Sequence, residues 1–198
     1  MPSRHAVISM PRTKATRFQL SLIKKLTFYE RIPITYHKEF HSLEWSVDKL
    51  NRSLQENQET LIIKILPELL SEGQLSTIRW DLFDKIYFGR RRKLENQLVS
   101  FLIAQKTDQW IRSTITKWLV TTEPITITDE QINQFISSLQ KTKAVEQFVC
   151  NLNSATEEFW YETEDHEGYS RTIPTGYDYK KLCTNYDYVT ERLKNYVW

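Results

Sequence analysis

The feature of this sequence with the clearest chemistry is a run of four consecutive cations directly after Gly89. This basic cluster consists of Arg90, Arg91, Arg92 and Lys93. Arginine presents paired N–H donors that match two phosphate oxygens, so such a run is typical of anion binding. If Gly89 breaks a helix, the cluster begins the next one, where each cation opposes the helix dipole at about 0.3–1 kcal/mol. A sequence that tolerates this cost predicts an anionic ligand, and phosphate is the natural candidate.

A longer basic track would continue from this cluster along the chain. Its further members are Lys106, Trp110, Arg112 and Lys117. The cations would neutralise phosphates and the tryptophan ring could stack on a base, so the track predicts contact with a nucleic-acid backbone. No zinc-finger spacing, RNA-recognition motif or basic zipper is present, so the contact would not read base sequence. The alternative is a solvated helix face, balanced in part by Asp81, Asp84 and Glu95.

Charge is unevenly distributed between the two parts of the chain, which we expect to form one compact domain. Residues 1–120 carry 20 Lys or Arg against 12 Asp or Glu, whereas residues 121–198 carry 7 against 13. Within the acidic stretch 157–167, the aromatic residues Phe159, Trp160 and Tyr161 predict a contact with another protein subunit. Pairing of the basic cluster with these acids would instead favour a protein–protein adaptor or regulator that binds no nucleic acid.

Two histidines are the candidates for metal binding or catalysis. On a helix, His37 and His41 would share a face, and with Glu44 they could ligate zinc. The glutamate of zinc-protease motifs is missing after His37, so we predict no metal, cofactor or catalytic residue. Arg31 and His37 resemble the Arg–His pair of the HEPN ribonucleases, but Pro33 opposes the helix that carries this pair. A metal-dependent hydrolase or a ribonuclease therefore stays the last alternative.

Helices are the elements expected to position these residues. Four glycines and six prolines in 198 residues are fewer than a sandwich or barrel needs. Apolar residues recur with a helical period beyond residue 42, and the predicted helices include 60–71, 76–87, 94–102, 128–139, 144–152 and 187–196. Residues 14–28 fit one helix or a pair of strands. The predicted fold is mainly α, a bundle of six or seven helices with room for a small β element near the N-terminus.

The remaining features predict where such a protein acts. No apolar run is long enough to span a bilayer, and the N-terminus does not read as a secretory signal. The two cysteines, Cys150 and Cys183, are far apart and predict free thiols in a reducing compartment. We therefore expect a cytoplasmic, non-catalytic subunit of a larger assembly. In outline it looks like the small helical subunits of CRISPR effector complexes, which line bound nucleic acid in antiviral defence.

Overall fold

The centre of the protein is a five-stranded, fully parallel β-sheet with strand order β2-β3-β1-β4-β5. The computed structural model describes residues 3–11, 13, 15–26, 34–37, 46–56, 59–107, 123–152, 155–162 and 178–198. The strands are β1 (Arg4–Ser9), β2 (Ile34–His37), β3 (Thr60–Ile65), β4 (Lys85–Arg90) and β5 (Thr156–Trp160). The fold is therefore α/β, and the prediction of a mainly α bundle is wrong.

The error came from two segments, 60–71 and 76–87, which were predicted as helices but contain strands β3 and β4. Helices cover both faces of the sheet, so these strands are continuous apolar runs rather than alternating patterns. β3 reads TLIIKI and is buried at all six positions. Such a run lacks the strand period, and its apolar residues also fit a helical spacing. Pro67, which was expected to lie within a helix, begins the short 3-10 helix η2 (Pro67–Leu69) directly after β3.

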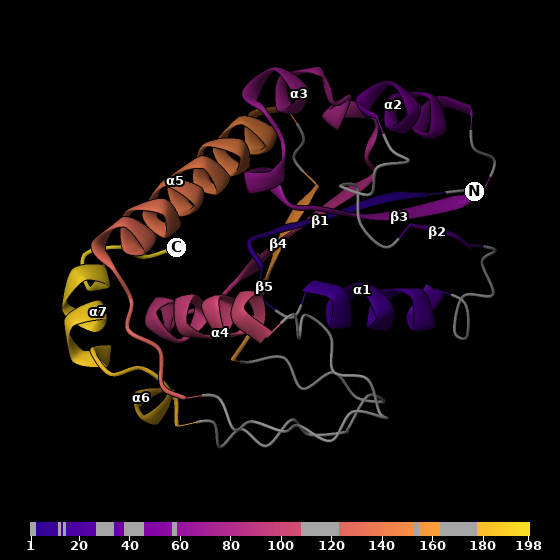
Figure 1. Ribbon diagram of the computed structural model, residues 1–198. Coiled ribbons are helices and arrows are strands. Elements are labelled where there is room, and N and C mark those ends of the chain that lie inside the picture. The colour runs from indigo at the N-terminus through magenta and orange to yellow at the C-terminus, as the bar shows by residue number, and fades with distance from the viewer. Residues whose placement is uncertain are drawn as a thin grey trace.

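Helices cover the two faces of the sheet (Figure 1). They are α1 (Ala15–Lys24) on one face, and α2 (Val47–Glu56), α3 (Glu72–Thr77) and part of α5 (Asp129–Leu152) on the other. Val7 and Ile62 point toward α1, while their neighbours Ile8 and Ile63 pack under α2 and α5. α1 resolves the ambiguity of residues 14–28 in favour of a helix, and the β element near the N-terminus is the central strand β1.

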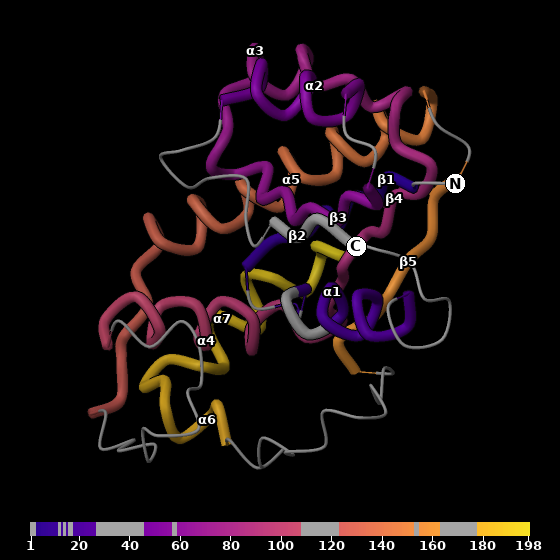
Figure 2. Tube along the Cα trace, turned by 90° about the vertical axis from the view of Figure 1, so that its right-hand side faces the viewer, coloured from indigo at the N-terminus to yellow at the C-terminus, as the bar shows by residue number. Residues whose placement is uncertain are grey.

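A helical layer lies beyond the carboxyl ends of the strands (Figures 1 and 2). It consists of α4 (Leu94–Thr107), the first half of α5, α6 (Tyr179–Leu182) and α7 (Tyr186–Leu193). Leu98, Ile132 and Val189 belong to its core, and Met10, directly after β1, joins them. The layer is therefore seated on the carboxyl edge of the sheet. The helices predicted at 94–102 and 187–196 are confirmed, whereas 128–139 and 144–152 form one continuous helix.

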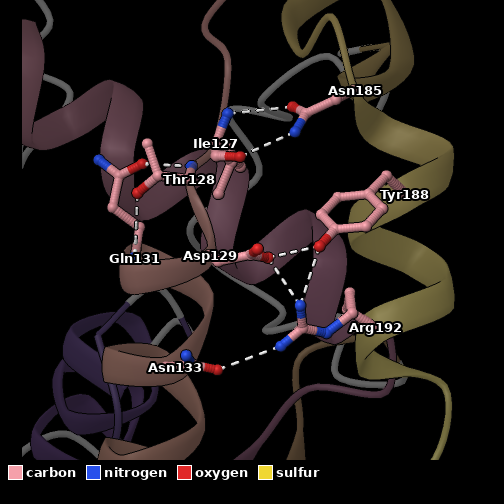
Figure 3. Close-up of polar contacts among 8 residues, drawn as sticks. All are labelled: Ile127, Thr128, Asp129, Gln131, Asn133, Asn185, Tyr188 and Arg192. Carbon is pink, nitrogen blue, oxygen red and sulfur yellow. Dashed lines mark hydrogen bonds and ion pairs between the residues drawn. The ribbon is translucent and has the colours of Figure 1, made fainter.

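The segment before α7 and α7 itself are anchored to the N-terminus of α5 (Figure 3). The side chain of Asn185 accepts a hydrogen bond from the backbone N–H of Ile127 at 3.0 Å and donates to its carbonyl oxygen at 2.7 Å. The carboxylate of Asp129 accepts hydrogen bonds from Tyr188 at 2.5 Å and from Arg192 at 2.6 Å. These contacts fix the start of α5, the helix that begins in the helical layer at the carboxyl ends of the strands and continues over one face of the sheet (Figure 1).

Candidate functional site

The carboxyl edge of the sheet around β1 is the place where the fold favours a ligand. α1 leaves β1 on one face, while η2 and α3, which follow β3, lie toward the other face (Figure 1). Open α/β sheets bind ligands outside the carboxyl ends of strands where such connections diverge. The residues at this edge are those directly after β1, β3 and β4, namely residues 10–11, 66–68 and 91–93.

The basic cluster lies at this edge. Arg90 ends β4 and α4 begins at Leu94, so the cluster precedes a helix as predicted. Gly89 does not break a helix, because it lies inside β4, where an added Cβ would run into the ring of Phe159 on β5. The parallel register pairs Ser9 of β1 with Gly89, so the cluster begins beside the end of the central strand.

Arg90 is neutralised inside the protein. Its Nη2 atom pairs with Glu146 of α5, and its Nη1 atom lies 2.9 Å from a carboxylate oxygen of Glu158 on β5. The arginine side chain is 14% exposed. Burial raises the pKa of Glu146, although the positive charge of Arg90 opposes this shift. Arg90 therefore connects α5 and β5 to the end of β4 and is already occupied by carboxylates.

Arg91 is also held internally, by aromatic side chains. It is 3% exposed, and its guanidinium carbon lies 4.0 Å from the centre of the Tyr161 ring and 5.4 Å from that of Tyr179. Its Nη2 atom donates a hydrogen bond to the Tyr179 hydroxyl at 3.3 Å. A cation over aromatic faces is attracted by about 0.5–2 kcal/mol. Arg91 thus joins the segment after β5 and helix α6 to the cluster.

Arg92 and Lys93 are the exposed members of the cluster. Their backbone N–H groups donate to one carboxylate oxygen of Glu162, at 3.0 Å and 3.3 Å. N–H groups at the start of a helix lack partners within it, and the helix dipole favours an anion there. Glu162 therefore shows that the N-terminus of α4 binds a carboxylate group, beside two cationic side chains that face solvent.

The other predicted site residues are placed as follows. Lys106 is exposed in the last turn of α4, at the opposite end from the cluster. Phe159 is 2% exposed and stacks on Phe18 of α1, with ring centres 4.1 Å apart. Trp160 and Tyr161 are half-buried against the arginines. Trp110, Arg112 and Lys117 lie outside the described residues.

The histidine hypothesis falls largely outside the described part of the chain. His37 ends strand β2, so the helix that would align it with His41 is absent at that position. Arg31, His41 and Glu44 are not among the described residues. Within the ranges that are described, no three His, Cys, Asp or Glu side chains cluster as metal ligands would. The metal and ribonuclease alternatives therefore stay predictions.

A pocket of about 330 Å³, which sequence reasoning missed, opens at the same edge of the sheet. The turn after β1 contributes Met10 and Pro11, η2 contributes Glu68, and the rest of the wall comes from α4 and α5. The amide nitrogen of Gln97 on α4 donates to the carbonyl oxygen of Pro11 at 2.8 Å, which fixes the wall to the turn. No motif marks the pocket, because four separate regions of the sequence meet only in the folded protein.

The comparisons with known proteins add no assignment. Neither a model of a known protein family nor a curated protein sequence matches the chain. Over the part of the chain that is described, no helix is both long and apolar enough to pass through a bilayer.

Proposed function

We propose that this protein binds a phosphate-bearing small molecule, in the simplest case a nucleotide, at the carboxyl edge of its sheet. The observation that carries the proposal is the position of Arg92 and Lys93. They follow β4 and directly precede α4, and β4 itself pairs with the end of the central strand β1 through Gly89 and Ser9. The exposed cations and the N-terminus of α4 together offer the two kinds of group that hold phosphate oxygens.

The contact between Gln97 and Pro11 supports a single compact site. It brings the second turn of α4 onto the turn that follows β1. Lys93 lies four residues before Gln97, which is about 6 Å along a helix axis. A phosphate at the start of α4 would therefore lie within reach of the crevice where the connections of the central strands diverge.

The internal contacts of the cluster limit the size of the anion that it would accept. Arg90 is paired with carboxylates and Arg91 is buried under tyrosine rings, so two of the four cations already have partners inside the protein. The exposed pair, Arg92 and Lys93, suits one phosphate or diphosphate better than a long polyanion. Glu162 already satisfies the backbone N–H groups, and a phosphate would compete with its carboxylate for them.

Contact with a nucleic-acid backbone is the second candidate, and the exposure of Lys106 favours it. Arg92, Lys93 and Lys106 are exposed residues at the two ends of α4, a 14-residue helix of about 21 Å. A nucleic acid that followed this helix from its start to its last turn would meet positive charge at both ends. The pairing of Arg90 with Glu158 joins the basic part of the chain to the acidic stretch, and this contact supports the alternative of a protein–protein adaptor.

One titration series distinguishes these functions. ADP, inorganic phosphate and a single-stranded 12-mer RNA are titrated into the wild type and into Arg92→Ala, Lys93→Ala and Lys106→Ala at two salt concentrations. A phosphate site predicts that the first two variants weaken ADP binding by about tenfold each, because one charge-assisted contact is lost. Lys106→Ala is the matched control, since it removes an exposed cation from the same helix.

Each outcome favours one function. ADP binding that depends on Arg92 and Lys93 but not on Lys106 supports the phosphate site. RNA binding that all three variants weaken, with a steep salt dependence, supports the nucleic-acid track. If neither ADP, phosphate nor RNA binds at low salt, the phosphate proposal fails and the adaptor alternative gains.

A further inference from the structure

The pocket beside the turn after β1 continues into a second hollow, and the two together form a groove between α4 and α5. This second space, the outer hollow, has a volume of about 400 Å³. It shares Leu102, Gln105 and Gln131 with the wall of the pocket, so the two spaces adjoin. The wall residues of each helix recur at intervals of three and four, so each set occupies one helix face. They are Leu98, Phe101, Leu102 and Gln105 of α4, and Gln131, Gln134, Phe135 and Ser138 of α5.

The pocket end of the groove is lined mainly by hydrocarbon. Leu98 is 1% exposed and Phe135 is 7% exposed, and both line the pocket together with Phe101 and Met10. These four side chains belong to the core of the helical layer or pack against it, so packing fixes their positions. An apolar group placed against this wall leaves water, and its transfer is favourable. The pocket end therefore suits a hydrocarbon group.

The outer hollow carries a positive charge and a hydrogen-bond donor. Lys106 is exposed there and is the charged member of its described lining, whereas Glu68 lines the pocket and not the outer hollow. Within the described part of the chain, no carboxylate pairs with the Lys106 ammonium group. Gln131 uses its side-chain oxygen to accept from the backbone N–H of Thr128 at 3.0 Å, which leaves its NH₂ group as a donor. An ionised carboxylate accepts hydrogen bonds without donating any, so it matches this end of the groove.

The length of the groove sets the length of a ligand that would use both ends. Leu98 and Lys106 lie eight residues apart on α4, which is about 12 Å along the helix axis. We infer that the groove binds a small amphipathic carboxylate with a hydrocarbon tail of medium length. Its carboxylate lies on Lys106, and its tail passes Leu102 toward Leu98 and Phe135.

This groove is separate from the phosphate site at the start of α4. Arg92 and Lys93 precede α4, whereas Lys106 lies in its last turn. Neither Arg92 nor Lys93 lines the pocket or the outer hollow. The inference therefore goes beyond the phosphate site and does not depend on it.

The test uses ligand-observed saturation-transfer NMR on the full chain with three probes. Octanoate carries both the charge and the tail, acetate carries the charge without the tail, and octylamine carries the tail with the opposite charge. We expect octanoate to bind with a Kd of about 0.1–1 mM, and acetate and octylamine to bind at least tenfold more weakly. Acetate or octylamine that binds as well as octanoate overturns the inference, and so does octanoate that does not bind.

Variants of Lys106 test the charged end. Lys106→Ala weakens octanoate binding by about tenfold, because one charge-assisted contact is lost. Lys106→Glu reverses the preference, so that octylamine binds better than octanoate. Lys25→Ala is the matched control, since Lys25 is an exposed lysine that follows α1 and lines neither space of the groove. Octanoate binding that Lys106→Ala leaves unchanged, or that Lys25→Ala weakens equally, overturns the inference.

Variants of two neighbouring serines test the apolar end. Ser138→Leu fills the pocket and weakens octanoate binding by at least tenfold, whereas Ser137→Leu places the same side chain on an exposed neighbour in α5 and leaves binding unchanged. Equal binding by the two variants overturns the inference. Lys106→Glu decides the matter if Ser138→Leu does not fold, because Lys106 is exposed. The ADP titration is read separately, so failure of one site does not decide the other.

Discussion

Replacing Gly89 with alanine tests how closely β4 and β5 pack where the basic cluster begins. The ring of Phe159 occupies the space that a side chain at this position would need. That ring stacks on Phe18 with centres 4.1 Å apart and planes 2° apart, and Phe159 is 2% exposed. The ring therefore cannot move away from a new methyl group without losing its stack. We expect Gly89→Ala to destabilise the fold.

The expected magnitude follows from the packing. Forcing an extra methyl group into a packed core costs about 1–3 kcal/mol. For a chain of this size each kcal/mol lowers Tm by about 2–4 °C, so Tm falls by about 2–12 °C. Gly73→Ala is the matched control, because the nearest atom to its added Cβ is Ser71 Oγ at 4.0 Å. In α3 this change is expected to stabilise by up to about 1 kcal/mol. Urea unfolding followed by far-UV circular dichroism measures both.

A double variant isolates the steric cause. Phe159→Leu alone leaves a void and is expected to cost about 1–2 kcal/mol. Combined with Gly89→Ala, the smaller side chain makes room for the methyl group. The double variant should therefore be more stable than the sum of the single losses by about 1 kcal/mol. Alanine at position 89 that is as stable as glycine, or losses that simply add, would refute the steric reasoning.

Three further predictions concern stability, pH and thiol reactivity. Asn185→Ala removes both hydrogen bonds to the backbone of Ile127 and should cost about 1–3 kcal/mol in urea unfolding; an unchanged midpoint would contradict their role. Because burial raises the pKa of Glu146, its protonated form stabilises the fold at low pH, and this contribution is lost as pH rises through the folded pKa. The stability of the wild type relative to Glu146→Gln should therefore fall as pH rises through the raised pKa of Glu146, and an increase in stability would mean that the ion pair dominates. Cys150 is exposed, whereas Cys183 is buried with a raised pKa, so a thiol reagent should label one cysteine quickly, and Cys150→Ser should abolish that fast phase.

The helices could be predicted where one face is buried and the other is solvated. In α2 the buried residues Val47, Leu50 and Leu54 follow a helical spacing, and the sequence shows this stripe directly. In the strands β3 and β4 both faces are covered, so the pattern that separates a strand from a helix disappears. The β-branched content of TLIIKI was the remaining signal, and it favoured a strand.

The candidate site could be predicted in part. The run of cations is visible in the sequence, and so is its place before a helix. Its partners are not, because Glu146 and Glu162 lie 56 and 70 residues from the arginines that they contact. The pocket around Glu68 had no local signal at all. Its walls come from four separate regions that meet only in the folded protein, which a single sequence does not reveal.

Glu146 and Glu158, the two carboxylates that pair with Arg90, lie late in the chain, and this order matters during synthesis. The ribosome makes β1, β3, β4 and the basic cluster before it makes α5 and β5. Until Glu146 and Glu158 emerge, Arg90 lacks both of its counter-charges and β4 presents an open edge. An open edge and bare arginines attract other chains and RNA. The nascent polypeptide therefore exposes more positive charge than the finished protein. Once α5 and β5 are complete, Glu146 and Glu158 neutralise Arg90.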